Sequence, residues 1–374
     1  MSMDALDRLK ILSTDSQYDL SCSCGTSKNP REHRQRRQDG SWLYPVSLPS
    51  GGKGLILKTL ASNVCTSDCA YCPLRHGTDA VRRCSLSSDE IANLFLEQNR
   101  RTPLIGLFLS SGIVGTADQT MQKLIDTARI LRKKHQYRGY LHLKIIPGAS
   151  EAAIEEALRL SSHVSLNIEV PGEKYFRNVS RYKHFNEDII RPIRYIAEHS
   201  GKHTEHPRVK WSSQFIVGAT SENDAEIVRY MGAMYDRLHL NRLFFSAYQP
   251  PPDAIFRLDD GSQNRRADRE HRLYQTDWLV RKYGFKTEEL LFDSNGFLDL
   301  ARDPKQVWAN AHPEFFPVCL NTADRNTLLR VPGIGPTAAD AIIRRRAIHR
   351  LGCWTDVPLT GARAARAYRY CIFS

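Results

Sequence analysis

Short hydrophobic runs alternate with helix-like stretches between residues 54 and 250. Six of these runs have the length and the β-branched or aromatic content of buried strands. They span residues 54–60, 104–109, 140–146, 163–170, 208–217 and 242–248. The intervening stretches repeat apolar residues at helical spacing, as Leu124, Ile125, Ala128 and Leu131 do. The alternation predicts an α/β fold in which crossover helices join parallel strands.

Local signals place the starts of several helices. Ser87 is followed three residues later by Glu90, the spacing of a capping box. Ser150 precedes a second helix-like stretch and is expected to cap it. Two architectures fit the alternation, an open doubly wound sheet and an open (βα)6 partial TIM barrel. Periodicity does not choose between them, but both place functional groups at the carboxyl ends of the strands.

The pattern divides the chain into four parts. Residues 1–53 contain a polar, basic stretch and are expected to form an irregular N-terminal extension. Residues 54–250 form the alternating region, which ends at three consecutive prolines. Residues 251–317 are expected to form a helical connector packing on the barrel, and residues 318–374 a small all-α unit.

Composition limits the setting in which the chain works. Hydrophobic residues make up 41% of the 374, and no apolar run approaches the roughly 18 residues that span a bilayer. The first twenty residues lack the basic and apolar regions of a secretory signal. We therefore expect a cytoplasmic protein with no membrane partner. Nine cysteines in such a chain indicate metal or redox chemistry before disulfides.

Three of the cysteines lie within eight residues, directly after the first predicted strand. Cys65, Cys69 and Cys72 have the spacing C-x3-C-x2-C. Thiolates suit iron–sulfur clusters, and three of them can hold three corners of a cubane while leaving the fourth iron open. The alternative is structural zinc, which needs a closed set of four ligands with His76 or Cys84 as the fourth.

This motif, followed by β–α alternation, resembles the radical S-adenosylmethionine (radical SAM) superfamily. The resemblance covers about residues 54–250 and implies a partial barrel that carries a [4Fe-4S] cluster and S-adenosyl-L-methionine. It implies that Tyr71 lies near the adenine and that the turn after the second strand meets the methionine amino group. That turn departs from the family pattern. The cofactor-binding residues implied in this way are Tyr71, Ser110, Ser111, Gly112, Asn167, Glu169 and Gly218.

The resemblance also implies a mechanism. The reduced cluster passes one electron to the sulfonium, and the 5′-deoxyadenosyl radical that forms removes a hydrogen atom from the substrate. An external one-electron donor is implied, which the sequence does not identify.

A second motif lies near the C-terminus, where residues 320–346 read as helix, tight hairpin and helix. Asn321 or Thr322 is expected to cap the first helix, and Pro336 fits the first turn of the second. The pattern LxxVPGIGxxxAxxI resembles the helix-hairpin-helix module of DNA-binding proteins. The resemblance implies contacts to the DNA backbone without reading of sequence. The residues expected to bind DNA are Gly333, Gly335, Thr337, Arg344, Arg345 and Arg346.

Charge supports this reading. The chain has a net charge of +12 and an isoelectric point near 9.3. Residues 321–374 hold nine arginines, no lysine and three aspartates, so about half of the surplus lies in this segment. Such a surplus favours a polyanionic partner. A helical hairpin used only for packing is the alternative.

The two motifs together resemble radical SAM proteins named for DNA modification or repair. That resemblance implies a uracil-DNA-glycosylase-like protein as a partner. Two other functions fit the sequence: a radical SAM enzyme that modifies RNA or tRNA, and a DNA-binding protein whose cluster is structural or redox-sensing. Cys22 and Cys24 suggest a second site only if further cysteines such as Cys84 or Cys319 join them.

Overall fold

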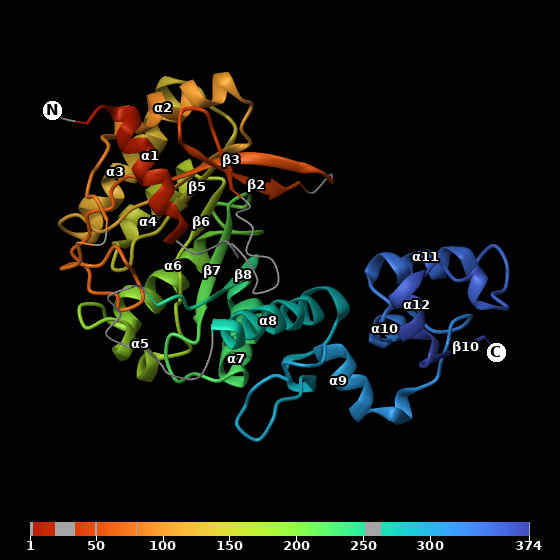
Figure 1. Ribbon diagram of the computed structural model, residues 1–374. Coiled ribbons are helices and arrows are strands. Elements are labelled where there is room, and N and C mark those ends of the chain that lie inside the picture. The colour runs from red at the N-terminus through yellow and green to blue at the C-terminus, as the bar shows by residue number, and fades with distance from the viewer. Residues whose placement is uncertain (1–2, 19–33, 49–50, 80, 251–262, 374) are drawn as a thin grey trace. The chain divides into compact units, whose positions relative to one another are not determined.

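The computed structural model describes residues 3–18, 34–48, 51–79, 81–250 and 263–373 (Figure 1). The chain divides into two compact units. The N-terminal unit comprises residues 1–222 and 233–267, and the C-terminal unit comprises residues 223–232 and 268–374. No helix among the described residues is both long and apolar enough to cross a membrane.

Eight strands of the N-terminal unit form one sheet in sequential order. The first two pairings, β1–β2 and β2–β3, are antiparallel, and β3 to β8 are parallel throughout. The strands are β1 Gln35–Arg36, β2 Trp42–Ser47, β3 Lys53–Leu60, β4 Gly106–Ser110, β5 Tyr140–Lys144, β6 His163–Ser165, β7 Lys210–Val217 and β8 Arg242–Ala247.

The strand order decides between the two predicted architectures. A doubly wound sheet reverses its strand order at a switch point, whereas a barrel winds in one direction. Strands β3 to β8 follow one another without reversal, which matches the partial barrel. All six predicted strands are present, although the fourth is shorter than expected because β6 ends at Ser165.

Helices connect the parallel strands, and Figure 1 shows α2, α3 and α4 along one side of the sheet. The predicted caps are confirmed: Ser87 and Glu90 form the capping box of α2, and the Ser150 hydroxyl accepts from the amide of Ala153 in α4. The helices here are α2 Ser88–Arg101, α3 Ala117–Arg129, α4 Glu151–Leu160, α5 Glu173–Val179, α6 Arg191–His199 and α7 Asp224–Leu238. Two π-helical segments follow α3 and precede α6, at Ile130–Lys134 and Phe185–Ile190.

The prediction that residues 1–53 are irregular is wrong for much of this segment. Helix α1 spans Ala5–Asp15 and a 3-10 turn spans Ser16–Tyr18. Leu9 and Leu12 are fully buried, and the Ser16 hydroxyl bonds the carbonyl oxygen of Lys58 on β3. Strands β1 and β2 extend the parallel sheet at the β3 edge. The segment is therefore part of the barrel unit.

The C-terminal unit is mainly helical. Its elements are α8 Gln263–Tyr283, whose first residues belong to the N-terminal unit, then 3-10 turn Thr287–Glu289, α9 Pro304–Ala311, 3-10 turn Pro313–Phe315, β9 Val318–Cys319, α10 Arg325–Arg330, α11 Pro336–Arg346, 3-10 turn Trp354–Asp356, α12 Gly361–Tyr368 and β10 Cys371–Ile372. Helix α9 lies in the segment predicted as a connector. The predicted boundary at residue 318 stays a prediction.

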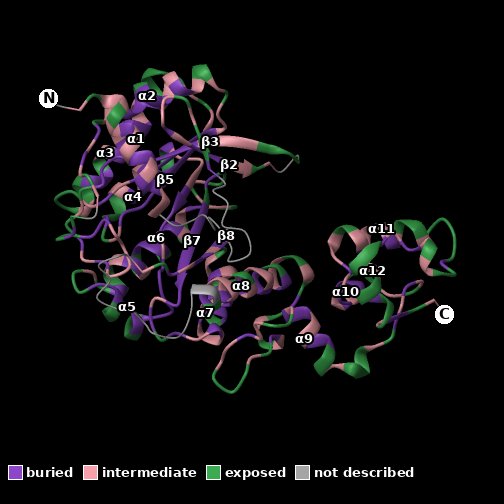
Figure 2. Cartoon of the chain, in the orientation of Figure 1, coloured by how far each residue is buried: buried purple, intermediate pink, exposed green. Residues whose placement is uncertain are grey.

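The buried residues of the C-terminal hairpin, which comprises α10, α11 and the turn between them, form one apolar core. Leu328, Leu329 and Ile342 are fully buried there. Figure 2 shows buried stretches in purple on α10 and α11. Pro336 occupies the first turn of α11 as predicted. The expected cap at Asn321 or Thr322 is wrong, because α10 starts later and the Asp324 carboxylate accepts from the amide of Thr327.

Candidate functional site

The three clustered cysteines line one cavity, here called the site cavity, at the carboxyl end of the parallel strands. They sit in the cysteine loop, residues 61–87, which connects β3 to α2. The opposite walls come from residues after β4, β5 and β6 and from β7. The lining includes the predicted residues Cys65, Cys69, Tyr71, Cys72, Ser110, Ser111, Gly112, Asn167 and Glu169. Segments far apart in sequence thus meet where a parallel barrel places its functional groups.

A single arginine holds the cysteine loop in shape. The guanidinium of Arg83 donates four hydrogen bonds to carbonyl oxygens of the loop, those of Asn63, Leu74, Arg75 and Thr78. The Asn63 side chain adds three more hydrogen bonds, because it donates to the Asp15 carboxylate at 2.6 Å and to the carbonyl oxygen of Arg82 at 2.8 Å and accepts from the amide of Cys84 at 2.7 Å. Because these bonds need no regular secondary structure, an irregular loop is fixed by side chains.

Backbone amides point at two of the sulfur atoms. Cys65 Sγ accepts from the amides of Ser67 and Ile113, and Cys72 Sγ accepts from the amide of Leu74, each at 3.4 Å. Amide donors stabilise negative charge on sulfur, which a thiolate ligand carries. Burial and the neighbouring Cys69 raise the pKa of the Cys72 thiol, so Cys72 is protonated in the absence of a metal.

Lys183 lies beside the buried Cys69. Its Nζ donates to Cys69 Sγ at 2.9 Å. Although burial alone lowers the pKa of Lys183, the negative charge and hydrogen bond of Cys69 outweigh this effect and raise it. Lys183 is therefore an ammonium group in contact with one of the three sulfurs. Because Lys183 lies 114 residues from Cys69, the sequence alone gives no sign of this contact.

Asp68 fixes the segment that carries Lys183. Its carboxylate accepts from the Ser180 hydroxyl at 2.5 Å and from the amides of Arg181 and Tyr182. Burial raises the pKa of Asp68, but these hydrogen bonds outweigh burial and lower it. A second tie runs from the amide of Ala70 to the carbonyl oxygen of Val179 at 2.8 Å. The cysteine loop and residues 179–183 therefore form one bonded structure.

Gly112 lets the loop after β4 pass against the cysteine loop. Its amide donates to the carbonyl oxygen of Ser62 at 2.7 Å. A Cβ atom built on Gly112 would lie 2.3 Å from the carbonyl oxygen of Val64 and 3.1 Å from Cβ of Cys65. Only glycine fits such a close approach of two backbones.

Polar side chains continue along the cavity from Tyr71 to Lys144. The Tyr71 hydroxyl donates to Glu169 Oε1 at 2.7 Å, Asn167 Nδ2 donates to Glu169 Oε2 at 3.5 Å, and Lys144 Nζ donates to Asn167 Oδ1 at 2.6 Å. Burial and the charge of Glu169 raise the pKa of Tyr71 well above its usual value. These hydrogen-bonded side chains bring a carboxylate, an amide and an ammonium group to one wall of the cavity.

The predicted strand 163–170, which contains Asn167 and Glu169, is too long. Both residues line the cavity, but they lie beyond the end of β6 and not on a continuous strand. Glu169 has a φ of +66°, a left-handed conformation uncommon outside glycine. Its amide donates to the carbonyl oxygen of Gln214 on β7, which holds the turn.

Gly218 does not line this cavity. It follows β7 with a φ of +79°, and its amide donates to Glu222 Oε1 at 2.6 Å. The Glu222 carboxylate also accepts from the hydroxyl of Thr220 at 2.6 Å. The structure therefore places Gly218 in a turn that Glu222 closes.

None of the other described cysteines lines this cavity. Cys84 is buried, which raises its pKa to about 11, and it does not line the cavity. Cys319 belongs to β9 in the C-terminal unit. Cys22 and Cys24 fall outside the described residues, so a second site at these positions stays a prediction.

The donor set fits an iron–sulfur cluster. Among the described ranges no group of three or more His, Cys, Asp or Glu side chains is placed to hold a single metal ion. The zinc alternative needs four donors around one ion. A cubane instead places each thiolate on its own iron. Three sulfurs on one cavity wall, with amide donors on two of them and an ammonium on the third, suit that arrangement.

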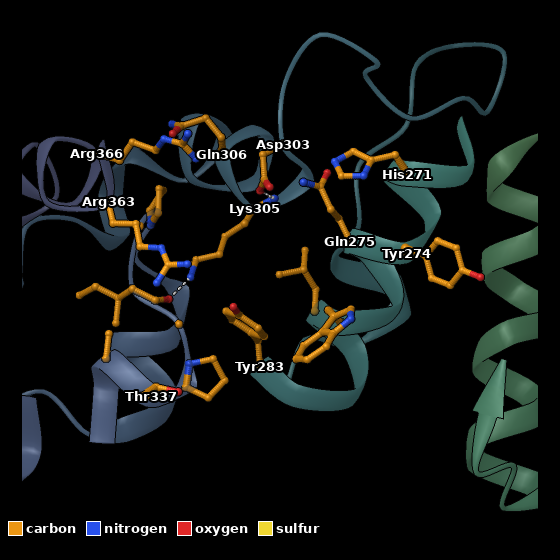
Figure 3. A pocket seen from close by; sticks show the side chains of 18 residues that line it. His271, Tyr274, Gln275, Tyr283, Asp303, Lys305, Gln306, Thr337, Arg363 and Arg366 are labelled. Atoms are coloured by element: carbon orange, nitrogen blue, oxygen red, sulfur yellow. Dashed lines mark hydrogen bonds between the residues drawn. The ribbon is translucent and has the colours of Figure 1, made fainter. Parts of the chain in front are cut away.

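A second cavity, of about 530 Å³ and here called the hairpin cavity, lies within the C-terminal unit (Figure 3). The turn between α10 and α11 contributes Gly333, Gly335 and Thr337 to its wall, and α12 contributes Arg363 and Arg366. Further lining residues come from α8 and α9. Lys305 is buried there, its Nζ donates to the carbonyl oxygen of Ile334 at 2.5 Å, and burial lowers its pKa to about 7.

Glycine is required at the hairpin turn. A Cβ atom on Gly333 would lie 2.3 Å from the carbonyl oxygen of Arg363, and its φ is +91°. Gly335 is the N-cap of α11 and has no side chain to satisfy the first-turn amides. The N-terminus of α11 therefore faces a cavity that also holds two arginines.

The three consecutive arginines lie elsewhere. Arg344 and Arg345 are exposed in the last turn of α11, and Arg346 donates to the carbonyl oxygen of Leu320 at 2.8 Å. None of the three lines the hairpin cavity. Arg363 and Arg366, which the sequence reasoning did not single out, occupy that position.

Similarity to a known protein family lies in the part of the chain that contains most of the parallel strands. The family model described as the radical SAM superfamily matches residues 59–233. Among solved structures, the chain is similar to the FeFe-hydrogenase maturase HydG from Carboxydothermus hydrogenoformans, with 15% identity and a TM-score of 0.47 over 77% of this chain and 73% of that chain. A second HydG structure, of a maturase of the FeFe-hydrogenase, gives 10% identity and a TM-score of 0.44 over 84% and 80%. No curated protein matches the sequence.

The matched residues contain the cysteine loop and most of the parallel strands whose ends line the site cavity. Residues 59–233, just under half of the chain, are therefore similar to the radical SAM superfamily of enzymes.

Proposed function

We propose that Cys65, Cys69 and Cys72 hold a [4Fe-4S] cluster and that the site cavity binds S-adenosyl-L-methionine at the remaining iron. One observation carries this proposal: the three sulfurs share a cavity with polar residues from the ends of neighbouring parallel strands. When bound, the cluster and cofactor supply one-electron reductive cleavage of the sulfonium, which releases a 5′-deoxyadenosyl radical.

The residues of the cavity have separate tasks in binding the cofactor. The backbone around Ser110, Ser111 and Gly112 receives the methionine amino group, because small residues leave room beside the cysteine loop. Glu169 accepts hydrogen bonds from ribose hydroxyls on the remaining lone pairs of its two carboxylate oxygens, and the Tyr71 hydroxyl holds it in place. Asn167, oriented by Lys144, adds a neutral donor. Gly218 is left out because it does not line the cavity.

We propose DNA as the substrate, with modification or repair of a nucleotide as the outcome. The support comes from the C-terminal hairpin and its resemblance to the helix-hairpin-helix module. First-turn amides of α11, without a side-chain cap, suit a phosphate oxygen, and Arg363 and Arg366 add positive charge beside them. Such contacts bind the backbone and leave the choice of base to the radical site.

Two further elements complete the proposal. An external one-electron donor must reduce the cluster, because no residue of the site supplies that electron. A uracil-DNA-glycosylase-like protein is proposed as a partner on the resemblance alone. Arg344 and Arg345 are exposed at the far end of α11 and are proposed to contact neighbouring phosphates.

Anaerobic reconstitution tests the enzyme proposal. The protein, loaded with iron and sulfide, is incubated with S-adenosyl-L-methionine and dithionite, and 5′-deoxyadenosine is measured by mass spectrometry. We expect 5′-deoxyadenosine from the wild type and none from Cys69→Ala. An intact cluster that yields no 5′-deoxyadenosine would instead support a structural or redox-sensing cluster.

Binding measurements test the substrate. Affinity for duplex DNA and for tRNA is compared over a series of salt concentrations, because backbone contacts release counterions. We expect tighter binding to duplex DNA. We expect the double variant Arg363→Met/Arg366→Met to lower the salt slope by about 2, and Arg344→Met/Arg345→Met to lower it less. Tighter binding to tRNA would replace DNA by RNA as the proposed substrate.

A further inference from the structure

The hairpin cavity is larger than contact with a DNA backbone requires. A phosphate oxygen held by first-turn amides needs only the exposed end of a helix. Here the hairpin turn faces a wall formed by α8 and α9, and Figure 3 shows Gln275 of α8 across the cavity from Thr337 and Arg363. The space of about 530 Å³ lies in the size range of pockets that enclose a small organic ligand. The cavity therefore has room for a whole nucleotide.

Contacts between the two walls keep this cavity open in the absence of a ligand. Lys305 of α9 donates through Nζ to the carbonyl oxygen of Ile334 in the hairpin turn at 2.5 Å. Arg330 of α10 forms an ion pair with Glu289, in the 3-10 turn that follows α8, at 2.6 Å. Because the walls are already joined, a ligand binds without the entropy cost of ordering them.

Aromatic side chains from α8 line one side of the cavity. Trp278 is 47% exposed and belongs to the lining. Tyr283 is half-buried, and a Cβ atom built on Gly335 would lie 3.1 Å from its hydroxyl oxygen, so this ring reaches the hairpin turn. Nucleobases stack on exposed aromatic rings whatever their sequence. The wall opposite the hairpin turn therefore suits a base.

The hairpin side of the cavity suits a phosphate with two negative charges. Arg363 and Arg366 are exposed, and neither makes an ion pair with a carboxylate within the described part of the chain. Among the described lining residues only Asp303 is acidic, and its carboxylate accepts from the amide of Lys305 at 2.9 Å. A phosphodiester carries one negative charge, whereas a phosphomonoester carries up to two. Two arginines beside the uncapped N-terminus of α11 match the phosphomonoester better.

We propose that the hairpin cavity holds the phosphorylated terminal nucleotide of a DNA strand, with its base on Trp278 and its phosphate between the α11 amides and the two arginines of α12. The choice of a strand end rests on DNA as the proposed substrate, since a free nucleotide has the same chemistry. The hairpin then recognises breaks and ends of DNA in preference to continuous duplex.

Three small probes test whether base and phosphate are bound together. They are 2′-deoxyadenosine 5′-monophosphate, 2′-deoxyadenosine, which lacks the phosphate, and 2-deoxyribose 5-phosphate, which lacks the base. Each is titrated into the reconstituted full-length protein and followed by ligand-observed NMR. Saturating S-adenosyl-L-methionine is present without reductant, so that adenine does not enter the cofactor site. We expect the monophosphate to bind at least about fivefold more tightly than either fragment.

Matched variants assign the two contacts. Trp278→Leu should remove the advantage of the monophosphate over 2-deoxyribose 5-phosphate, whereas Tyr368→Leu, at a 63% exposed aromatic residue outside the cavity, should keep it. Arg363→Met should weaken both phosphates about tenfold, and Arg302→Met, at an exposed arginine outside the cavity, should change neither. The wild-type measurements decide the proposal even if a variant fails to fold.

Three DNA molecules of one sequence identify the source of the nucleotide. They are a linear duplex with 5′-phosphates, the same duplex with 5′-hydroxyls, and a covalently closed dumbbell without ends. We expect the phosphorylated duplex to bind at least about fivefold more tightly than the other two. Equal binding of all three would overturn the strand end but leave DNA as the proposed substrate. Tight binding of the free monophosphate with no binding of any DNA would overturn both.

Equal affinities of the three small probes for the wild type would overturn the cavity proposal, whichever DNA binds.

Discussion

Removing the positive charge beside Cys69 should make the proposed cluster harder to reduce. Lys183 Nζ lies 2.9 Å from Cys69 Sγ, and Asp68 anchors the segment that precedes it. A cation next to a cluster ligand stabilises the reduced state more than the oxidised one, because the reduced cluster carries one more negative charge. Lys183→Met keeps most of the side-chain length but removes the ammonium group.

The magnitude follows from the hydrogen bond to a charged group. Such bonds contribute about 1.5 to 3 kcal/mol. Since a one-electron couple shifts by about 59 mV for each 1.4 kcal/mol, and since the bond also contributes in the oxidised state, the potential should fall by at most about 60 to 130 mV. Lys183 is only half-buried, so solvent screening places the expected value in the lower part of this range.

A redox titration of the reconstituted protein, followed by the electron paramagnetic resonance signal of the reduced cluster, measures the shift. Lys183→Arg keeps the charge and should stay within about 30 mV of the wild type. Lys202→Met removes an exposed lysine of the same unit and should have no effect. An unchanged or raised potential in Lys183→Met would refute the reasoning, provided that the iron content matches the wild type.

Three further predictions concern the cysteine loop, the buried His163 and the C-terminal hairpin. Gly112→Ala should lower the iron bound per chain in reconstitution, because its Cβ would lie 2.3 Å from a carbonyl oxygen, while Gly352→Ala, with no close contact, should bind iron normally. His163 has a pKa lowered to about 4, so the unfolded chain takes up a proton between pH 6.5 and 4 that the folded chain does not. From pH 7.5 to 5, urea unfolding should show a loss of about 2 kcal/mol due to His163, in addition to a loss due to His142, whose pKa is also lowered; His163→Gln should remove the part due to His163. Ile342→Ala should destabilise the hairpin by about 2 to 5 kcal/mol in hydrogen exchange, whereas Ile348→Ala, 84% exposed, should change it by less than about 0.5 kcal/mol.

The barrel could be predicted because its signals are local. Six hydrophobic runs correspond to β3 to β8, and the caps at Ser87 and Ser150 are confirmed. The cysteine spacing after the first parallel strand places three sulfurs on one loop. Period and spacing suffice for such features because they depend on residues that are neighbours in the chain.

Other parts of the structure depend on contacts between residues that are distant in the sequence. Helix α1 gave no clear signal, and it is held by packing of Leu9 and Leu12 together with Ser16 against the sheet. Arg83 donates to four carbonyl oxygens, and Lys183 contacts Cys69, only once the loops have folded. Charge counting found the arginine-rich segment but not which arginines reach the hairpin turn. Arg363 and Arg366 reach the hairpin turn because α12 packs beside it, which the sequence does not reveal.

The sequence shows the polar face of β5 but not where that face lies. His142 and Lys144 alternate with leucines on one predicted strand, a pattern that also describes a strand with one face in water. The structure shows that the polar face is enclosed. Only the winding of the sheet into a partial barrel encloses these side chains.

Mössbauer spectroscopy of the protein reconstituted with iron-57 tests the central claim most directly. With three cysteine ligands the account predicts a [4Fe-4S] cluster in which one iron differs from the other three and changes its spectrum when S-adenosyl-L-methionine is added. A cluster whose irons are all unaffected by the cofactor, or a protein that binds zinc at these cysteines in place of iron, would contradict it.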